Sequence, residues 1–182
     1  MATTTTHLTI DDFERLPAEE AGNYELVDGE LVPVSGNNPN NNAIRDLLIE
    51  RIRPFVLEHG LGKAYAEQEY DFNGNVHAPD VSFFRPDKRP LLNSFKRVQR
   101  FVPDLAIEVV SPNDTFAEVL RKKDRYRRCG TEEVWLISPD SREVLVYSAR
   151  GDRILREDAV LATDLIPGFE IPVKMLFEAD AD

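Results

Sequence analysis

Pro103-Asp-Leu-Ala-Ile-Glu-Val-Val-Ser-Pro112 contains the strongest single indication of the architecture. Leu105 to Val110 is short and almost continuously apolar, which is typical of a strand in the centre of a sheet. Glu108 interrupts this apolar run. An unpaired buried carboxylate costs roughly several kcal/mol, so Glu108 requires a metal ion, a cationic partner or a raised pKa. A structural salt bridge is the simpler alternative.

A second carboxylate, Asp80, belongs to an extended segment earlier in the chain. It follows Pro79 and precedes the β-rich run Val81-Ser-Phe-Phe84. An Asp after Pro is often only a turn residue. If this strand pairs with the strand that carries Glu108, both carboxylates reach one hard divalent cation, and the backbone carbonyl of Val109 becomes a third ligand. The pattern therefore favours a site for Mg²⁺ (or Mn²⁺).

Extended and helical segments alternate around these carboxylates, which indicates an α/β domain. Asp28-Gly29 predicts an N-terminal hairpin between Tyr24 to Val27 and Glu30 to Val34, and Asn73-Gly74 predicts a second one between Lys63 to Phe72 and Val76 to Phe84. Two further helices are expected, one over Ile10 to Leu16 capped by Thr9 and one from Ile44 to Gly60 that Pro54 kinks or shortens. Strands are expected over Glu133 to Ile137 and Glu143 to Ser148. The remaining segments are a loop over Ser35 to Asn42, a functional or mobile loop over Arg85 to Pro103, and an ordered, irregular C-terminal segment over Leu165 to Phe177.

A basic helix should connect the Glu108 strand to the strands that follow. Thr115-Phe-Ala-Glu118 matches a capping box, and Gly130 is a typical residue after a helix C-terminus. Arg121, Arg125 and Arg128 fall on the side opposite the apolar residues. This exposed stripe is either a solvated face or a contact for phosphate groups.

Lys122 and Lys123 fall nearer the apolar side of the same helix. A lysine at such a position either extends to solvent or points back toward Glu108. The helical periodicity alone does not distinguish the two lysines.

Composition restricts the class of protein. The 182 residues, with 42% hydrophobic and 30% charged residues, fit one globular domain. The chain has a single cysteine, no signal-peptide pattern and no apolar run near the length of about 18 residues that a membrane span needs, so we expect a cytoplasmic protein. A net charge of -11 argues against a nonspecific nucleic-acid coat, but the basic residues between Arg121 and Arg128 leave room for a local basic site.

Several motifs together resemble the Uma2 family of restriction endonucleases, within the PD-(D/E)XK nuclease superfamily. The resemblance covers the chain from about Leu8 to Phe177, and the motifs agree in order and spacing. They are Tyr24-Glu-Leu-Val-Asp-Gly-Glu30, Ala78-Pro-Asp-Val81, the stretch from Pro103 to Pro112, the spacing of Lys122 and Tyr126, Gly130 to Trp135, and Leu165-Ile-Pro-Gly-Phe169.

The resemblance implies a restriction endonuclease-like α/β core, with a mixed central sheet flanked by helices and an N-terminal hairpin. It implies a nuclease domain over residues 8–178, a flexible N-terminus over residues 1–7 and an acidic tail over residues 179–182. The implied activity is metal-dependent hydrolysis of phosphodiester bonds in DNA. Many restriction-type nucleases act on both strands as pairs, so a homodimer is also suggested.

The resemblance also assigns residues. Asp80 and Glu108 match the acidic positions of the superfamily, whereas the position of its usual lysine is Val110 here. Uma2-like sequences carry the lysine on the next helix, four residues before an aromatic residue, and Lys122 matches that place. Glu25 matches a recurrent glutamate of the first hairpin, which either contacts metal or water or is simply exposed.

One position departs from the family pattern. Where many relatives have a histidine near the start of the long helix, this chain has Asn40, Asn41 and Asn42. One alternative is therefore a nuclease fold that serves only as a nucleic-acid or protein adaptor. Failure to bind a divalent metal ion would favour this alternative. A dimerisation scaffold, in which the acidic pair forms a structural ion-pair site, is another, and it would lack affinity for nucleic acid at low salt.

Overall fold

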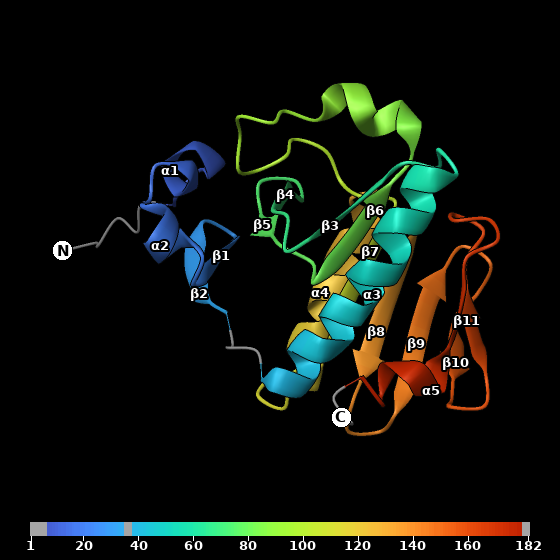
Figure 1. Ribbon diagram of the computed structural model, residues 1–182. Coiled ribbons are helices and arrows are strands. Elements are labelled where there is room, and N and C mark those ends of the chain that lie inside the picture. The colour runs from blue at the N-terminus through green and yellow to red at the C-terminus, as the bar shows by residue number, and fades with distance from the viewer. Residues whose placement is uncertain (1–6, 35–37, 180–182) are drawn as a thin grey trace.

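The computed structural model describes residues 7–34 and 38–179, which form a mixed central sheet with a smaller N-terminal unit beside it (Figure 1). The predicted segments that fall on residues 1–6, 35–37 and 180–182 lie outside the described residues. The central sheet has the strand order β10-β9-β8-β7-β6-β3, in which β7 and β8 are parallel and the other neighbours antiparallel. Its strands are β3 (Lys63–Ala66), β6 (Val81–Phe84), β7 (Leu105–Val109), β8 (Glu133–Ser138), β9 (Glu143–Ser148) and β10 (Arg153–Leu155).

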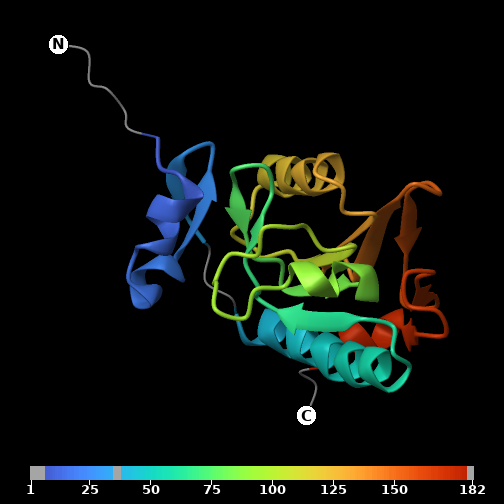
Figure 2. The same cartoon turned by 90° about the horizontal axis from the view of Figure 1, so that it is seen from above.

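Helices α3 (Pro39–Glu58) and α4 (Phe116–Arg128) cover opposite faces of this sheet (Figure 2). Side chains alternate between the faces of a strand, so one strand serves both layers. In β7, Leu105 and Ile107 belong to the buried cluster under α3, whereas Ala106 belongs to the cluster under α4. The same alternation turns Glu108 toward α4.

The N-terminal unit contains a second sheet, with the order β2-β1-β5-β4. Its elements are α1 (Ile10–Glu14), α2 (Ala18–Ala21), β1 (Tyr24–Val27), β2 (Glu30–Pro33), β4 (Tyr70–Asp71) and β5 (Val76–His77). The second predicted hairpin is therefore divided between two sheets. Its base, β3 and β6, lies in the central sheet, and its tip, β4 and β5, lies in the N-terminal sheet. The break follows β3, where Glu67 has a positive φ of 51°.

Local signals at several helix and turn positions are confirmed. Thr9 caps α1 and Thr115 caps α4, each with a capping box. Asp28 and Gly29 have φ values of 51° and 82°, as a two-residue hairpin turn requires. None of the described helices is long and apolar enough to cross a membrane.

The predicted start of α3 is wrong, and of the two effects predicted for Pro54, a kink or a shortening, the shortening does not occur. The helix begins at Pro39, inside the predicted loop, because Asn38 caps it by accepting a hydrogen bond from the Asn41 backbone N–H at 2.9 Å. Proline is also well suited to the first helical position. At the other end the helix passes through Pro54 and continues to Glu58, so Pro54 does not shorten it.

Two predicted irregular segments contain regular structure. The segment from Arg85 to Pro103 includes the 3-10 helix η1 (Pro86–Leu91) and is attached to β4 through Gln99, whose carbonyl accepts from the Asp71 N–H at 2.9 Å. The expected C-terminal segment contains β12 (Glu170–Pro172), which pairs with β11 (Val160–Ala162), and then α5 (Val173–Leu176). Backbone pairing with distant segments organises both regions.

The fold makes a prediction about Gly62, just before β3. Its φ is +146°, and a Cβ atom there would overlap the carbonyl oxygen of Phe84 on β6. Gly62→Ala should therefore destabilise the protein by about 2 kcal/mol more than Gly60→Ala, which is also strained at φ +64° but meets nothing within 4 Å. Urea unfolding of both variants measures the difference, and equal losses would contradict the proposed backbone clash.

Candidate active site

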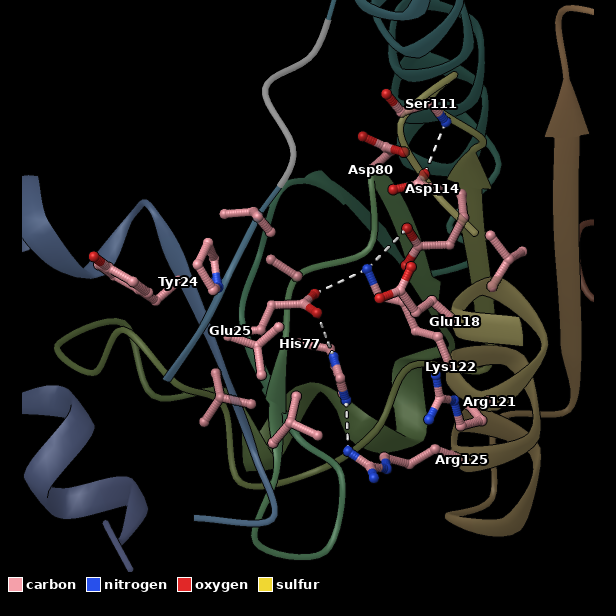
Figure 3. A pocket seen from close by; sticks show the side chains of 18 of the residues that line it. Tyr24, Glu25, His77, Asp80, Ser111, Asp114, Glu118, Arg121, Lys122 and Arg125 are labelled. Carbon is pink, nitrogen blue, oxygen red and sulfur yellow. Dashed lines mark hydrogen bonds and ion pairs between the residues drawn. The ribbon is translucent and has the colours of Figure 1, made fainter. Parts of the chain in front are cut away.

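A pocket of about 830 Å³ lies between the N-terminal hairpin and α4, with residues of β7 at its base (Figure 3). Its lining includes many more acidic than basic side chains. The acidic ones are Glu25, Asp28, Glu67, Glu69, Asp80, Glu108, Asp114 and Glu118, and the basic ones are Arg121, Lys122 and Arg125. An acidic pocket with a few placed cations suits a bound metal ion better than a direct, metal-free phosphate contact.

Strand pairing brings Asp80 and Glu108 together. Val81 on β6 pairs with Ile107 on β7 in antiparallel register, and the next step outward places Asp80 opposite Glu108. Residues opposite each other in an antiparallel pair point to the same face. The backbone N–H of Val109 also donates to Asp80 Oδ2 at 2.7 Å, which fixes that carboxylate against β7.

Helix α4 supplies the cation that faces Glu108. Lys122 Nζ lies 3.1 Å from Glu108 Oε2 and 2.8 Å from Glu25 Oε1. One turn later, the Tyr126 hydroxyl donates to Glu108 Oε1 at 2.6 Å. Glu108, whose side chain is only 14% exposed, thus has a polar partner on each oxygen.

The structure distinguishes Lys122 from its neighbour. Lys123 pairs with Asp124, and its ammonium group lies 4.6 Å from the centre of the Tyr147 ring on β9. Of the two lysines that helical periodicity left open, the one that faces the acidic residues is Lys122.

The pKa values of these groups reflect burial and mutual charge. Burial, assisted by the nearby negative charges of Asp80 and Glu25, raises the pKa of Glu108 to about 8. Burial also raises the pKa of Asp80. Burial opposes the charge on Glu25 and Lys122 too, but their attraction outweighs it and lowers the pKa of Glu25 while raising that of Lys122. Lys122 therefore remains an ammonium ion.

His77 is a site residue that sequence reasoning missed. The side chain is almost completely buried, and its Nδ1 lies 2.9 Å from Glu25 Oε2. Burial lowers the pKa of His77. The pairing of Leu26 with Val76 between β1 and β5 places Glu25 next to His77, so a correct alignment of the two hairpins would have found this contact.

The predicted arginine stripe is only partly correct. Arg121 and Arg128 are exposed, and Arg121 lines the pocket. Arg125 is 20% exposed, because it turns toward the N-terminal unit and pairs with Asp28 at 3.1 Å. The expectation that the three arginines share one exposed face is therefore wrong for Arg125. The upstream basic residues Lys96, Arg97 and Arg100 form ion pairs with Glu14, Glu69 and Asp11.

The donor set fits a hard divalent cation. Among the described residues, no group of three or more His, Cys, Asp or Glu side chains is arranged to hold a metal ion. Mg²⁺ does not need such a group, because it commonly binds one or two carboxylates together with waters and substrate phosphate. Asp80 and Glu108 provide two carboxylates on one face, and the Val109 carbonyl, 3.4 Å from Asn41 Nδ2, belongs to the residue that follows Glu108.

The fold is shared with a solved crystal structure. The crystal structure of a "putative nuclease belonging to DUF820 from Anabaena variabilis ATCC 29413" superimposes with a TM-score of 0.83, at 24% sequence identity over 94% of this chain and 98% of that chain. The central mixed sheet flanked by helices is thus the restriction endonuclease-like fold. The comparison with curated proteins gives no significant match.

The family is defined by sequence. The family model of Uma2, described as "Putative restriction endonuclease", matches residues 10–174, so the chain belongs to the Uma2 family. The resemblance inferred from the motifs is confirmed. Family and fold together indicate a nuclease of the restriction-endonuclease type.

The raised pKa of Glu108 predicts how metal affinity depends on pH. Only the ionised carboxylate binds a cation, and a proton competes for Glu108 below a pKa of about 8. Apparent Mg²⁺ affinity should therefore fall by about tenfold per pH unit as the pH decreases below this value, with one proton released on binding. Calorimetric titration in buffers of different ionisation enthalpy measures both quantities. Affinity that does not change over this range would exclude Glu108 as a ligand.

Proposed function

We propose that this protein is a divalent-metal-dependent endonuclease that hydrolyses phosphodiester bonds in DNA. The observation that carries the proposal is the position of Lys122, whose ammonium group lies between Glu25 and Glu108 beside the carboxylate of Asp80. Two carboxylates that suit a hard cation, next to a charged lysine in an open pocket, can bind a phosphodiester and stabilise the charge that develops on it.

Asp80, Glu108 and the Val109 carbonyl would hold Mg²⁺ or Mn²⁺. When bound, the cation supplies Lewis acidity to the phosphodiester and to a water molecule. Lys122 then stabilises negative charge on the phosphoryl oxygens or orients the attacking water. The pKa of Lys122 is raised, so its side chain is already an ammonium ion. Lys122 can therefore act without first gaining a proton.

Glu25 and Tyr126 position the central residues. Tyr126 holds one oxygen of Glu108 at 2.6 Å, which restricts the rotation of that carboxylate. Glu25 contacts the same ammonium group as Glu108 does. If a cation engaged Glu108, the contact with Glu25 would still hold Lys122 in the pocket. Glu25 can also contact a water in the pocket.

Arg121 and Arg128 are proposed to contact the phosphate backbone outside the reacting group. Both are exposed on α4, the helix that also carries Lys122. DNA as the polymer rests on the family description of a restriction endonuclease. Two copies would place one candidate active site at each DNA strand, so we also propose a homodimer, which light scattering of the purified protein would test.

The activity itself is tested by incubating plasmid and single-stranded DNA with the protein in Mg²⁺ or Mn²⁺. Asp80→Asn should abolish cleavage and the metal-induced rise in melting temperature, because it removes a ligand. Lys122→Met should reduce cleavage by about 10²-fold or more while leaving metal binding in place. Lys123→Met, a matched control on the next residue, should retain activity because Lys123 faces the Tyr147 ring.

The outcome of this experiment separates the proposed nuclease from the two alternatives. DNA binding without metal binding or cleavage would identify a binding module, for which the asparagines in place of the family's histidine at Asn40 to Asn42 offer a reason. Absence of both metal and DNA binding would favour a scaffold with a structural ion-pair site. Loss of activity in Lys123→Met but not in Lys122→Met would show that the wrong lysine is assigned.

The proposed phosphate contacts predict a change in the salt dependence of DNA binding. Each lost phosphate contact lowers the slope of log affinity against log salt by about one unit, so Arg121→Gln with Arg128→Gln should flatten it by about two. Arg51→Gln with Arg153→Gln removes the same charge from exposed positions on α3 and β10 and should leave the slope unchanged. Titration of labelled DNA measures both, and identical slopes for the two double variants would exclude the arginine contacts.

A further inference from the structure

His77 lies at the centre of a chain of polar contacts that joins the N-terminal unit to α4. Its Nδ1 is 2.9 Å from Glu25 Oε2, and its Nε2 is 3.3 Å from Arg125 Nη1. Figure 3 shows Glu25, His77 and Arg125 joined by these contacts, with Lys122 reaching Glu25 from α4. Because His77 is only 3% exposed, its ring nitrogens face protein groups rather than solvent.

The contact with Arg125 determines which nitrogen of His77 carries the proton. A guanidinium group only donates hydrogen bonds, so Nε2 must accept and is unprotonated. The single proton of the neutral ring is therefore on Nδ1, where it can be donated to Glu25. Arg125 itself is held by acceptors of the N-terminal unit, Asn75 Oδ1 at 2.8 Å and Asp28 Oδ2 at 3.1 Å.

The closeness of His77 to Glu25 bears on the orientation of that carboxylate. With Oε2 occupied by His77, Oε1 faces Lys122 at 2.8 Å. A carboxylate without the first contact would be free to rotate about its side chain and to change its distance from the ammonium group. His77 thus affects the position of Lys122 relative to Glu108, although no hydrogen bond joins His77 to Lys122.

The same contacts exclude a direct chemical role for His77. The two ring nitrogens face Glu25 and Arg125, and the ring packs against the stacked pair of Phe72 and Tyr126, with centroid separations of 5.7 and 5.6 Å. A general base must reach the proton that it removes, and no nitrogen of His77 is free to do so.

We propose that His77 is a positioning residue, fixed as the Nδ1–H tautomer by Arg125, that orients Glu25 and through it the active lysine, Lys122. The part of this proposal that concerns activity rests on the proposed nuclease function. The part that concerns the tautomer rests on geometry alone. The proposal assigns Arg125 to the site itself, where it contacts His77, instead of to a phosphate contact on the exposed arginine stripe.

The tautomer can be measured without any cleavage assay. The chain has three histidines, so nitrogen-15 spectra of labelled protein resolve each ring. We expect His77 to show a protonated Nδ1 and an unprotonated Nε2 at neutral pH. Arg125→Met should produce a mixture of the two tautomers, whereas Arg125→Gln, which retains an N–H donor, should keep more of the Nδ1–H form. A predominant Nε2–H form in the wild-type protein would overturn the proposal.

Substitution of His77 tests the effect on Lys122. The amide nitrogen of an asparagine reaches the position of the histidine Nδ1, so His77→Asn keeps a donor for Glu25, while His77→Leu removes it. His77→Leu should lower kcat by about tenfold or more with little change in KM, because misplaced catalytic groups reduce the rate more than they reduce binding. His77→Asn should restore most of the loss. Equal kcat in the two variants, with both folded by melting temperature, would overturn the positioning role.

The two proposals fail in different ways. If the wild-type protein cleaves no DNA in either metal, the nuclease function is wrong, and the nitrogen-15 spectra alone decide the assignment of His77 and Arg125. If the wild-type protein cleaves DNA but His77→Leu matches it in kcat, the nuclease function stands and the positioning role is wrong.

Discussion

A buried ammonium group shared by two carboxylates holds the parts of this molecule together. Lys122 comes from α4, Glu108 from the central sheet and Glu25 from the N-terminal sheet, so their contacts join three separate elements. Bringing these charges out of water is costly, and each depends on the others for compensation. Removing one partner of such a buried pair costs roughly 3–5 kcal/mol, which makes the proposed active site a structural link between the two sheets as well.

The central sheet and its two carboxylates could be predicted from local patterns. An apolar run with one charged residue indicates a buried strand, and a fixed alternation of side chains determines which face Glu108 occupies. Capping boxes and the Asp28-Gly29 turn define element ends through contacts within a few residues, so they too were visible in the sequence. The family resemblance added the role of Asp80, which its position after Pro79 left open.

The remaining site residues depend on contacts between distant segments. Helical periodicity placed Lys122 and Lys123 on nearly the same side. Contacts with other elements separate them, because Lys122 reaches Glu25 and Glu108 whereas Lys123 packs on the Tyr147 ring. The prediction of an exposed arginine stripe was wrong for Arg125, because its hydrogen-bond acceptors, Asn75 and Asp28, belong to two different hairpins. His77 was missed for the same reason, since the alignment of β1 with β5 is not encoded near either strand.

The division of the second hairpin between two sheets makes one short segment a mechanical connection. His77 ends β5 in the N-terminal sheet, and Asp80 immediately precedes β6 in the central sheet, so Ala78 and Pro79 alone separate them. A proline in so short a connection leaves little conformational freedom. Any rotation of the N-terminal sheet is therefore transmitted directly to a proposed metal ligand. The two walls of the pocket are thereby coupled through the backbone, and lengthening this connection by a residue would weaken that coupling.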